Sequence, residues 1–157
     1  MRRILCLIAL HASLLYSGGA AHAAQEFDAK VIAVLDGDTV LLIDKEAGSP
    51  PLFYKLRLAD IDAPEKGQAH GEQATQALAR LVLKQPVQVT TVATDSYGRA
   101  IGWIALKPDA DMEASVNAAL VRRGWAWAQS RSRSAYLREA QQAAQRERLG
   151  LWASDQP

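Results

Sequence analysis

The side chains with the clearest chemical potential gather in three short motifs. These are Asp36-Gly37-Asp38-Thr39, the stretch RLADIDAPE at 57–65, and Asp95-Ser96-Tyr97-Gly98-Arg99. Carboxylate oxygens are the ligands that a hard divalent cation such as calcium prefers. Guanidinium groups bind phosphate in a bidentate manner and stabilise the charge that grows on it in a transition state. The combination is typical of metal-dependent hydrolysis of phosphodiesters.

These motifs lie at the ends of segments that are expected to form β-strands. Asp36-Gly37 is a strong hairpin signal, and we assign Asp36 mainly to that turn. In 53–59, Leu56 and Leu58 alternate with Arg57, so this strand is expected to direct Arg57 away from the core. Strands are predicted at 27–35, 40–43, 53–59, 87–92 and 100–106.

Three segments have the apolar spacing or the terminal signals of helices. They are 71–84, 115–123 and 134–149, the second ending at Gly124 and the third at Gly150. A helix between the third and fourth of five strands is the order of an OB-fold, a small barrel used for nucleic acids and oligosaccharides. The predicted fold class is therefore α+β, a five-stranded OB-fold barrel with three helices.

The first residues have the features of a signal peptide. Arg2 and Arg3 precede a mostly apolar run at 4–15, and Ala21-His22-Ala23 has the small-x-small pattern of a cleavage site. We expect residues 1–23 to be removed and 24–157 to form one domain with its core at about 28–152. Cys6, the one cysteine, lies in the removed segment. The mature protein is expected in the periplasm or the medium, without a membrane anchor.

Charge excludes a strong global attraction to polyanions. The 18 basic and 17 acidic side chains nearly balance, and two of the arginines lie in the signal segment. Any affinity for nucleic acid must come from a local patch, for which 131–133, Lys66 and Lys84 are the best candidates. No stable protein partner is implied, and a monomer is the default expectation.

At this point the chain resembles the staphylococcal nuclease-like (thermonuclease) domain family from about Asp28 to Trp152. The shared pieces occur in order at compatible spacing: VLDGDTV at 34–40, RL with DAPE in 57–65, GEQA at 71–74, DSYGR at 95–99, VN with LV and G in 116–124, and GLW at 150–152. The resemblance implies a calcium-dependent endo- and exonuclease that acts on DNA and RNA and leaves 3′-phosphate ends.

The resemblance also implies the roles of individual residues. Asp38, Asp62 and the backbone carbonyl of Ala63 would bind Ca²⁺, and Glu65 would orient or deprotonate the attacking water. Arg57 and Arg99 would bind the phosphate, with Arg99 the better candidate for the leaving oxygen. Tyr97 would lie near the substrate phosphate or sugar, although it could equally be a packing aromatic.

Alternatives remain for several of these residues and for the whole domain. Taken singly, Arg57 could be a residue of the strand surface and Glu65 a solvated loop residue, while Asp60 could support a second metal. Compared with the staphylococcal protein, the loop 66–70 is short and poor in lysine, and 129–132 lacks the tyrosines of the base site. The alternative function is a non-catalytic OB-fold module that binds nucleic acid or protein. Because such modules lose part of the acidic and arginine set, the complete set favours the enzyme.

Overall fold

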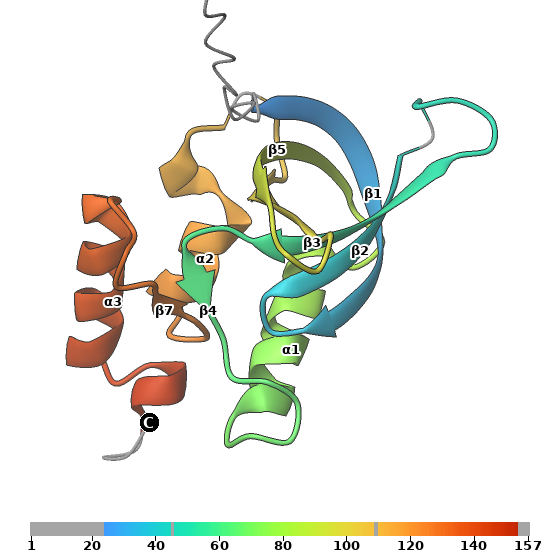
Figure 1. The fold of residues 1–157 in the computed structure, drawn as a ribbon. Coiled ribbons are helices and arrows are strands. Elements are labelled where there is room, and N and C mark those ends of the chain that lie inside the picture. The colour runs from blue at the N-terminus through green and yellow to red at the C-terminus, as the bar shows by residue number, and fades with distance from the viewer. Residues whose placement is uncertain (1–23, 45, 109, 154–157) are drawn as a thin grey trace, which may run out of the picture.

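The computed structural model describes residues 24–44, 46–108 and 110–153. The predicted signal segment 1–23 lies outside the described residues. The centre of the molecule is a closed five-stranded barrel in the order β1-β2-β3-β6-β5. Its strands are β1 (Gln25–Asp36), β2 (Thr39–Asp44), β3 (Leu52–Leu58), β5 (Pro86–Thr94) and β6 (Ala100–Ala105). This arrangement confirms the predicted OB-fold barrel (Figure 1).

The barrel closes because β1 is long enough to pair with two neighbours. Its second half pairs with β2 and its first half with β5, both antiparallel, whereas β3 and β6 pair in parallel. Register shifts between Val31 and Ala33 and between Thr91 and Ala93 bend the strands. The interior is filled by alternating apolar side chains that include Val31, Val40, Leu42, Leu56, Leu58, Val89 and Ile104.

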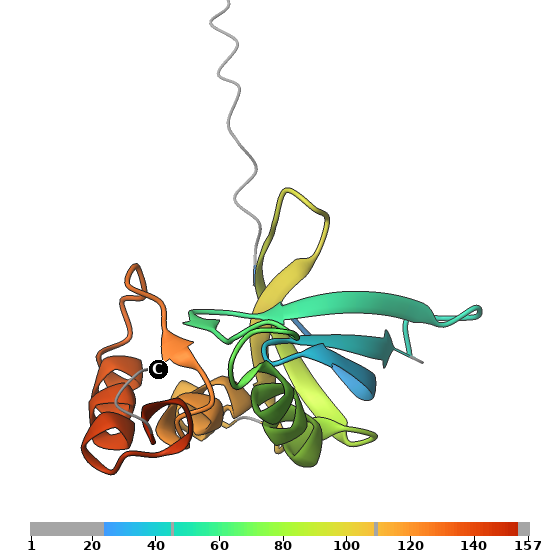
Figure 2. The ribbon, with the colours of Figure 1, turned by 90° about the horizontal axis from the view of Figure 1, so that it is seen from below.

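Three helices complete the core. Helix α1 (Gly71–Val82) packs its apolar side against the barrel, and α2 (Val116–Arg122) lies between the barrel and α3 (Ala135–Arg146) (Figure 2). Ser115 and Ser134 cap α2 and α3 by accepting backbone N–H groups in the first turn. Helix α3 ends three residues earlier than the predicted 149, because Arg148 adopts a left-handed backbone with φ 52°.

A second, two-stranded sheet was not predicted. Strand β4 (Ile61–Asp62) pairs antiparallel with β7 (Trp127–Ala128), so the segment after β3 lies beside the segment after α2 (Figure 1). Two short 3₁₀ turns, η1 (Met112–Ala114) and η2 (Gly150–Trp152), complete the elements. Among the described residues, no helix is long and apolar enough to cross a bilayer.

Candidate active site

The hairpin between β1 and β2 presents Asp38 at the rim of the barrel. Asp36 accepts the backbone N–H of Asp38 at 3.1 Å, which closes the turn as predicted. The Thr39 hydroxyl donates to Asp38 Oδ1 at 2.9 Å, and the Asp38 residue is only 3% exposed. A side chain on Gly37 would meet the Cβ of Ala63 at 2.8 Å, so glycine lets the turn approach the segment that carries the other predicted ligands.

Arg57 joins the two carboxylates that are predicted to bind metal. It lies opposite Thr39 in the β2–β3 register. Its Nη1 donates to Asp38 Oδ1 at 3.1 Å, and its Nη2 lies 2.9 Å from Asp38 Oδ2. The same Nη2 donates to Asp62. Arg57 is therefore more than a residue of the strand surface, since one guanidinium holds Asp38 and Asp62 together.

The electrostatics of Asp38 are dominated by its burial. Loss of hydration raises the pKa of this carboxyl to about 7, although Arg57 and the Thr39 hydroxyl oppose the rise and Asp36 adds to it. Arg57 alone thus does not compensate the charge of Asp38. A second positive charge beside the carboxylate would be strongly favourable.

Asp62 lies on β4, and the C-terminal half of the chain holds β4 in place. Gln129, just after β7, donates its backbone N–H to the carbonyl of Asp60 at 2.9 Å and its side-chain amide to the carbonyl of Ile61 at 3.1 Å. Asp60 itself adopts a left-handed backbone, φ 60°, which turns the chain from β3 into β4. The supporting role of Gln129 was missed, because nothing local in the sequence indicates that 129 lies beside 60–61.

Asn117 fixes the other end of this turn from inside the protein. It is fully buried on α2, donates to the carbonyls of Ala59 and Gly102 at 3.0 and 3.2 Å, and accepts the N–H of Ile104 at 3.3 Å. It therefore connects β6 to the residue that precedes Asp60. A polar residue among the apolar positions of a short helix was the available signal for this role.

Replacing Asn117 by alanine is expected to lower the free energy of unfolding by about 3 kcal/mol, since buried backbone groups lose their partners at about 1–3 kcal/mol each. Urea denaturation of the variant measures this loss. Gln142→Ala, at an exposed position of α3, is the control and should change stability by less than about 0.5 kcal/mol. An equally small change in Asn117→Ala would contradict the proposed connection.

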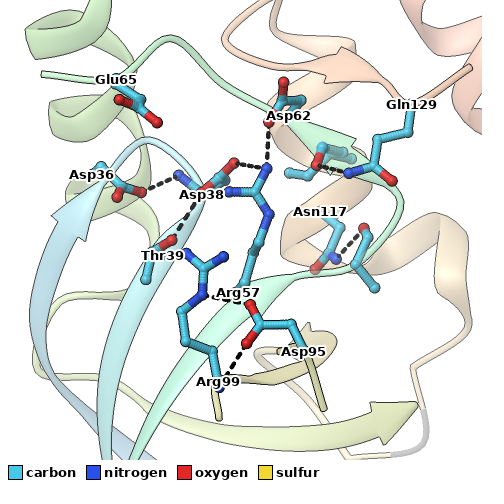
Figure 3. Close-up of polar contacts among 12 residues, drawn as sticks. Asp36, Asp38, Thr39, Arg57, Asp62, Glu65, Asp95, Arg99, Asn117 and Gln129 are labelled. Carbon is cyan, nitrogen blue, oxygen red and sulfur yellow. Dashed lines mark hydrogen bonds and ion pairs between the residues drawn. The ribbon is translucent and has the colours of Figure 1, made fainter. Parts of the chain in front are cut away.

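Glu65 is positioned by its backbone, which leaves its carboxylate available. Its N–H donates to the side chain of Gln68 at 2.8 Å, and its carbonyl accepts the N–H of Gln68 at 3.0 Å. Any Cβ at position 71 would meet the Glu65 carbonyl at 2.0 Å, so Gly71 is required where the loop returns onto Glu65 to begin α1. Glu65 is exposed and points toward Asp38 (Figure 3).

The β5–β6 hairpin supplies the second arginine. Asp95 accepts the N–H groups of Tyr97 and Arg99, both at 2.9 Å, and the Arg99 Nε at 2.7 Å. Desolvation alone would raise the pKa of Asp95, but these donors and the charge of Arg99 hold the pKa below its ordinary value. Asp95 therefore caps the turn and orients Arg99, whose guanidinium lies on the same side of the barrel as that of Arg57 (Figure 3).

Tyr97 is placed at the surface rather than in the core. It is 83% exposed, and the Arg99 guanidinium lies 5.6 Å from its ring centroid. A packing role is therefore wrong for this tyrosine. A contact with substrate stays a prediction.

A groove of about 450 Å³ opens beside Arg57 and Asp62. Its other walls come from β7 and the residues after it, among them Trp127, Gln129 and Arg131. Of the basic residues predicted to form a local rim, Arg131 thus reaches the site. His70 is partly buried in the loop before α1.

The predicted cation site has few protein ligands. Within the ranges that the structure describes, no three His, Cys, Asp or Glu side chains are arranged as a metal-binding group. The predicted donors are two carboxylates and one main-chain carbonyl, all hard oxygen ligands suited to calcium. The uncompensated burial of Asp38 fits a cation at this point. Water and substrate oxygens would have to complete the coordination.

Comparison with known proteins agrees with the fold. Residues 55–154 match the family model described as staphylococcal nuclease homologue. The chain is 39% identical over 136 residues to a protein of Shigella flexneri named micrococcal nuclease, covering 82% of this chain and 75% of that protein. It is 38% identical over 160 residues to protein ParB of Escherichia coli, covering 97% and 87% of the two chains.

A further relative is an uncharacterized endonuclease of Haemophilus influenzae, 33% identical over 129 residues that cover 82% of this chain and 67% of the relative. The family match spans more than half of the chain and includes Arg57, Asp62, Glu65 and Arg99. The resemblance seen in the motifs is thereby confirmed. The chain belongs to the staphylococcal nuclease family.

Proposed function

We propose that this chain is a calcium-dependent nuclease that hydrolyses phosphodiester bonds of DNA and RNA and leaves 3′-phosphate ends. The observation that carries the proposal is the convergence of Asp38 and Asp62 on Arg57, with Arg99 and Glu65 on the same side of the barrel (Figure 3). The names of the relatives, micrococcal nuclease and endonuclease, support the same reaction class.

The cation would be held by the side chains of Asp38 and Asp62 and by the backbone carbonyl of Ala63. When bound, calcium neutralises phosphate charge and polarises the phosphoryl group. The side chain at 63 does not matter for this contact, since only a main-chain oxygen is used. The close approach of the turn at Gly37 to Ala63 supports this choice of ligands.

The remaining side chains supply the other requirements of an in-line displacement. Glu65 accepts a proton from the water whose oxygen forms the new bond to phosphorus. Arg57 and Arg99 bind the phosphoryl oxygens and stabilise the charge that develops on them. The bond from phosphorus to the 5′ oxygen breaks, that oxygen takes up a proton, and the phosphate stays on the 3′ side. Arg99 would assist the departing oxygen.

Arg57 must exchange partners during this cycle. In the structure its guanidinium is occupied by Asp38 and Asp62. To bind a substrate phosphate, the guanidinium would have to exchange these carboxylates for phosphoryl oxygens. Asp38 and Asp62, which would hold the cation, are thus also the groups that compete with phosphate for Arg57.

The proposal includes export. Residues 1–23 have the composition of a signal peptide, so the mature enzyme would begin at Ala24 in the periplasm or the medium. N-terminal sequencing of the protein recovered from those fractions tests this point. A chain that keeps Met1 in the cytoplasm would overturn it.

Cleavage by the mature chain from Ala24 tests the activity. Single-stranded DNA and RNA should be cut with calcium and remain intact with a chelator. The DNA products should resist extension by a polymerase until a phosphatase removes the 3′-phosphate. Folded protein that binds calcium and nucleic acid without cutting would instead support the non-catalytic OB-fold module.

A further inference from the structure

A second groove lies on the other side of the arginine pair from the one beside Asp62. It has a volume of about 270 Å³ and opens between the first half of β3 and the β5–β6 hairpin. The two elements diverge there because β3 pairs with β6 only from Leu56 onward. Its walls include Phe27, Phe53, Tyr54, Lys55, Thr94 and Gly98.

Strand β3 connects this groove directly to Arg57. Side chains two residues apart on a strand share a face and lie about 6.7 Å apart. Lys55 and Phe53 therefore lie on the outer face of β3 with Arg57, Lys55 about 6.7 Å and Phe53 about twice that distance along the strand. The opposite face carries Leu56 and Leu58, both fully buried, which confirms the alternation.

The hairpin connects the groove to the other arginine. Gly98 and Ala100, the neighbours of Arg99 in the chain, both line the groove. Gly98 has a left-handed backbone, φ 75°, and the position of a Cβ there is open space. A chain bound across Arg57 and Arg99 could thus continue into the groove without crossing a ridge of side chains at the turn.

One aromatic side chain of the groove, Phe53, is accessible. Phe53 is 61% exposed, although apolar side chains of this size are usually covered. Tyr54 and Phe27, whose ring centroids lie 5.0 Å apart, are partly buried against the core and form the inner wall of the same groove. The groove therefore offers a flat apolar surface next to a cationic side chain.

Charge distinguishes this groove from others on the barrel. Lys55 is the charged side chain of its lining. A groove near η1 contains Glu26 and Asp111, and another at the β2 end contains four acidic residues, Glu26, Asp28, Asp44 and Glu46. A polyanion leaving the arginine pair would be repelled by those grooves and attracted by this one.

We propose that this groove is a subsite for an unpaired base of the nucleic-acid substrate, about two nucleotides from the phosphate held by Arg57 and Arg99. Phe53 stacks on the base, and Lys55, on the same face of β3, contacts the intervening phosphate. A base held in a duplex cannot enter, so the groove selects single strands. This inference rests on the proposed nuclease function. Aromatic stacking of bases in single-strand sites contributes on the order of five-fold to a hundred-fold in affinity per base.

Binding and cleavage of short oligonucleotides test the subsite. The proteins are the mature chain, Phe53→Ala and Lys55→Gln, with Leu106→Ala as the control at an exposed apolar position of a different groove. Fluorescence anisotropy with a chelator present measures the affinity for a ten-nucleotide single strand, for the same strand with one abasic position, and for a ten-base-pair duplex. Kinetics with calcium compare the ten-nucleotide strand with a dinucleotide.

Phe53→Ala is expected to weaken binding of the single strand and raise its KM at least about five-fold. The kcat should be unchanged, as should the kinetics of the dinucleotide, which is too short to reach Phe53. For the original protein, one abasic position in the strand should weaken binding. For Phe53→Ala, the same abasic position should cause little further loss. Lys55→Gln should weaken binding and flatten its salt dependence.

If Phe53→Ala and Lys55→Gln bind and cut as Leu106→Ala does, the subsite is wrong. The subsite is also wrong if Phe53→Ala loses as much affinity for the duplex as for the single strand. If the original protein bound the strand without cutting it, the proposed nuclease function would fail. The anisotropy series would still decide whether the groove takes a base, because that series requires no cleavage.

Discussion

Glu65→Gln is expected to lower the rate of cleavage by about 10² to 10⁴, the usual contribution of a general base. The amide has nearly the shape of the carboxylate but cannot accept a proton from water. The backbone contacts of Glu65 with Gln68 and Gly71 do not involve the carboxylate, so the loop should keep its conformation. Single-turnover cleavage of a labelled single strand with saturating calcium measures the chemical step directly.

Glu72→Gln is the matched control. Glu72 is also an exposed glutamate, one residue into α1, and it makes no contact with the arginines or carboxylates of the site. Its replacement should leave the rate within about two-fold. In Glu65→Gln, binding of the oligonucleotide in the presence of chelator should not weaken, because the substitution removes a negative charge that repels the phosphates. A variant that retained a tenth or more of the rate would remove Glu65 from the reaction.

The barrel could be predicted from the sequence because its strands are long enough to show alternation. In β3, the exposed Lys55 and buried Leu56 are distinguished by period alone. The hairpin at Asp36-Gly37 sets the β1–β2 pairing, and the helix before β5 gives the OB-fold order. Once the strands are in that order, the β2–β3 register brings Arg57 opposite Thr39, next to Asp38.

What could not be predicted was the support of the site by the C-terminal half. Strands β4 and β7 contain two residues each, too few for any periodicity, and their pairing joins positions far apart in the chain. The bonds of Gln129 to the 60–61 backbone exist only after that pairing. Asn117 belonged to a recognised motif, but its partners, Ala59 just after β3 and Gly102 and Ile104 on β6, depend on the packing of α2 against the barrel. Motifs therefore identified the side chains proposed to act, and tertiary structure identified those that hold them.

Asp38→Asn is expected to stabilise the metal-free protein while abolishing its response to calcium. Burial raises the pKa of Asp38 from 3.8 to about 7, so above pH 7 the folded protein carries a carboxylate that the fold disfavours. The native state binds more protons than the unfolded state between about pH 4 and 7, so stability falls as pH rises through this window. A rise of this size corresponds to about 4 kcal/mol at pH 8. An asparagine, which must still pack beside Arg57, should recover about 2–4 kcal/mol of it.

Urea unfolding at pH 8 and pH 4, with chelator or with calcium, checks each part of this expectation. The advantage of Asp38→Asn should fall below about 1 kcal/mol near pH 4, where Asp38 is protonated in the folded state and about half protonated in the unfolded chain. Calcium at pH 8 should stabilise the original protein but not Asp38→Asn. Asp44→Asn is the control, because Asp44 is also buried but accepts the N–H groups of Glu46 and Ala47 at 2.8 and 2.9 Å. It should give no gain. A gain at position 38 that persisted at pH 4 would show that packing, rather than charge, is the source. A gain confined to high pH would mean that the fold gives up stability to keep Asp38 charged, which is the cost expected of a carboxylate retained for binding a cation.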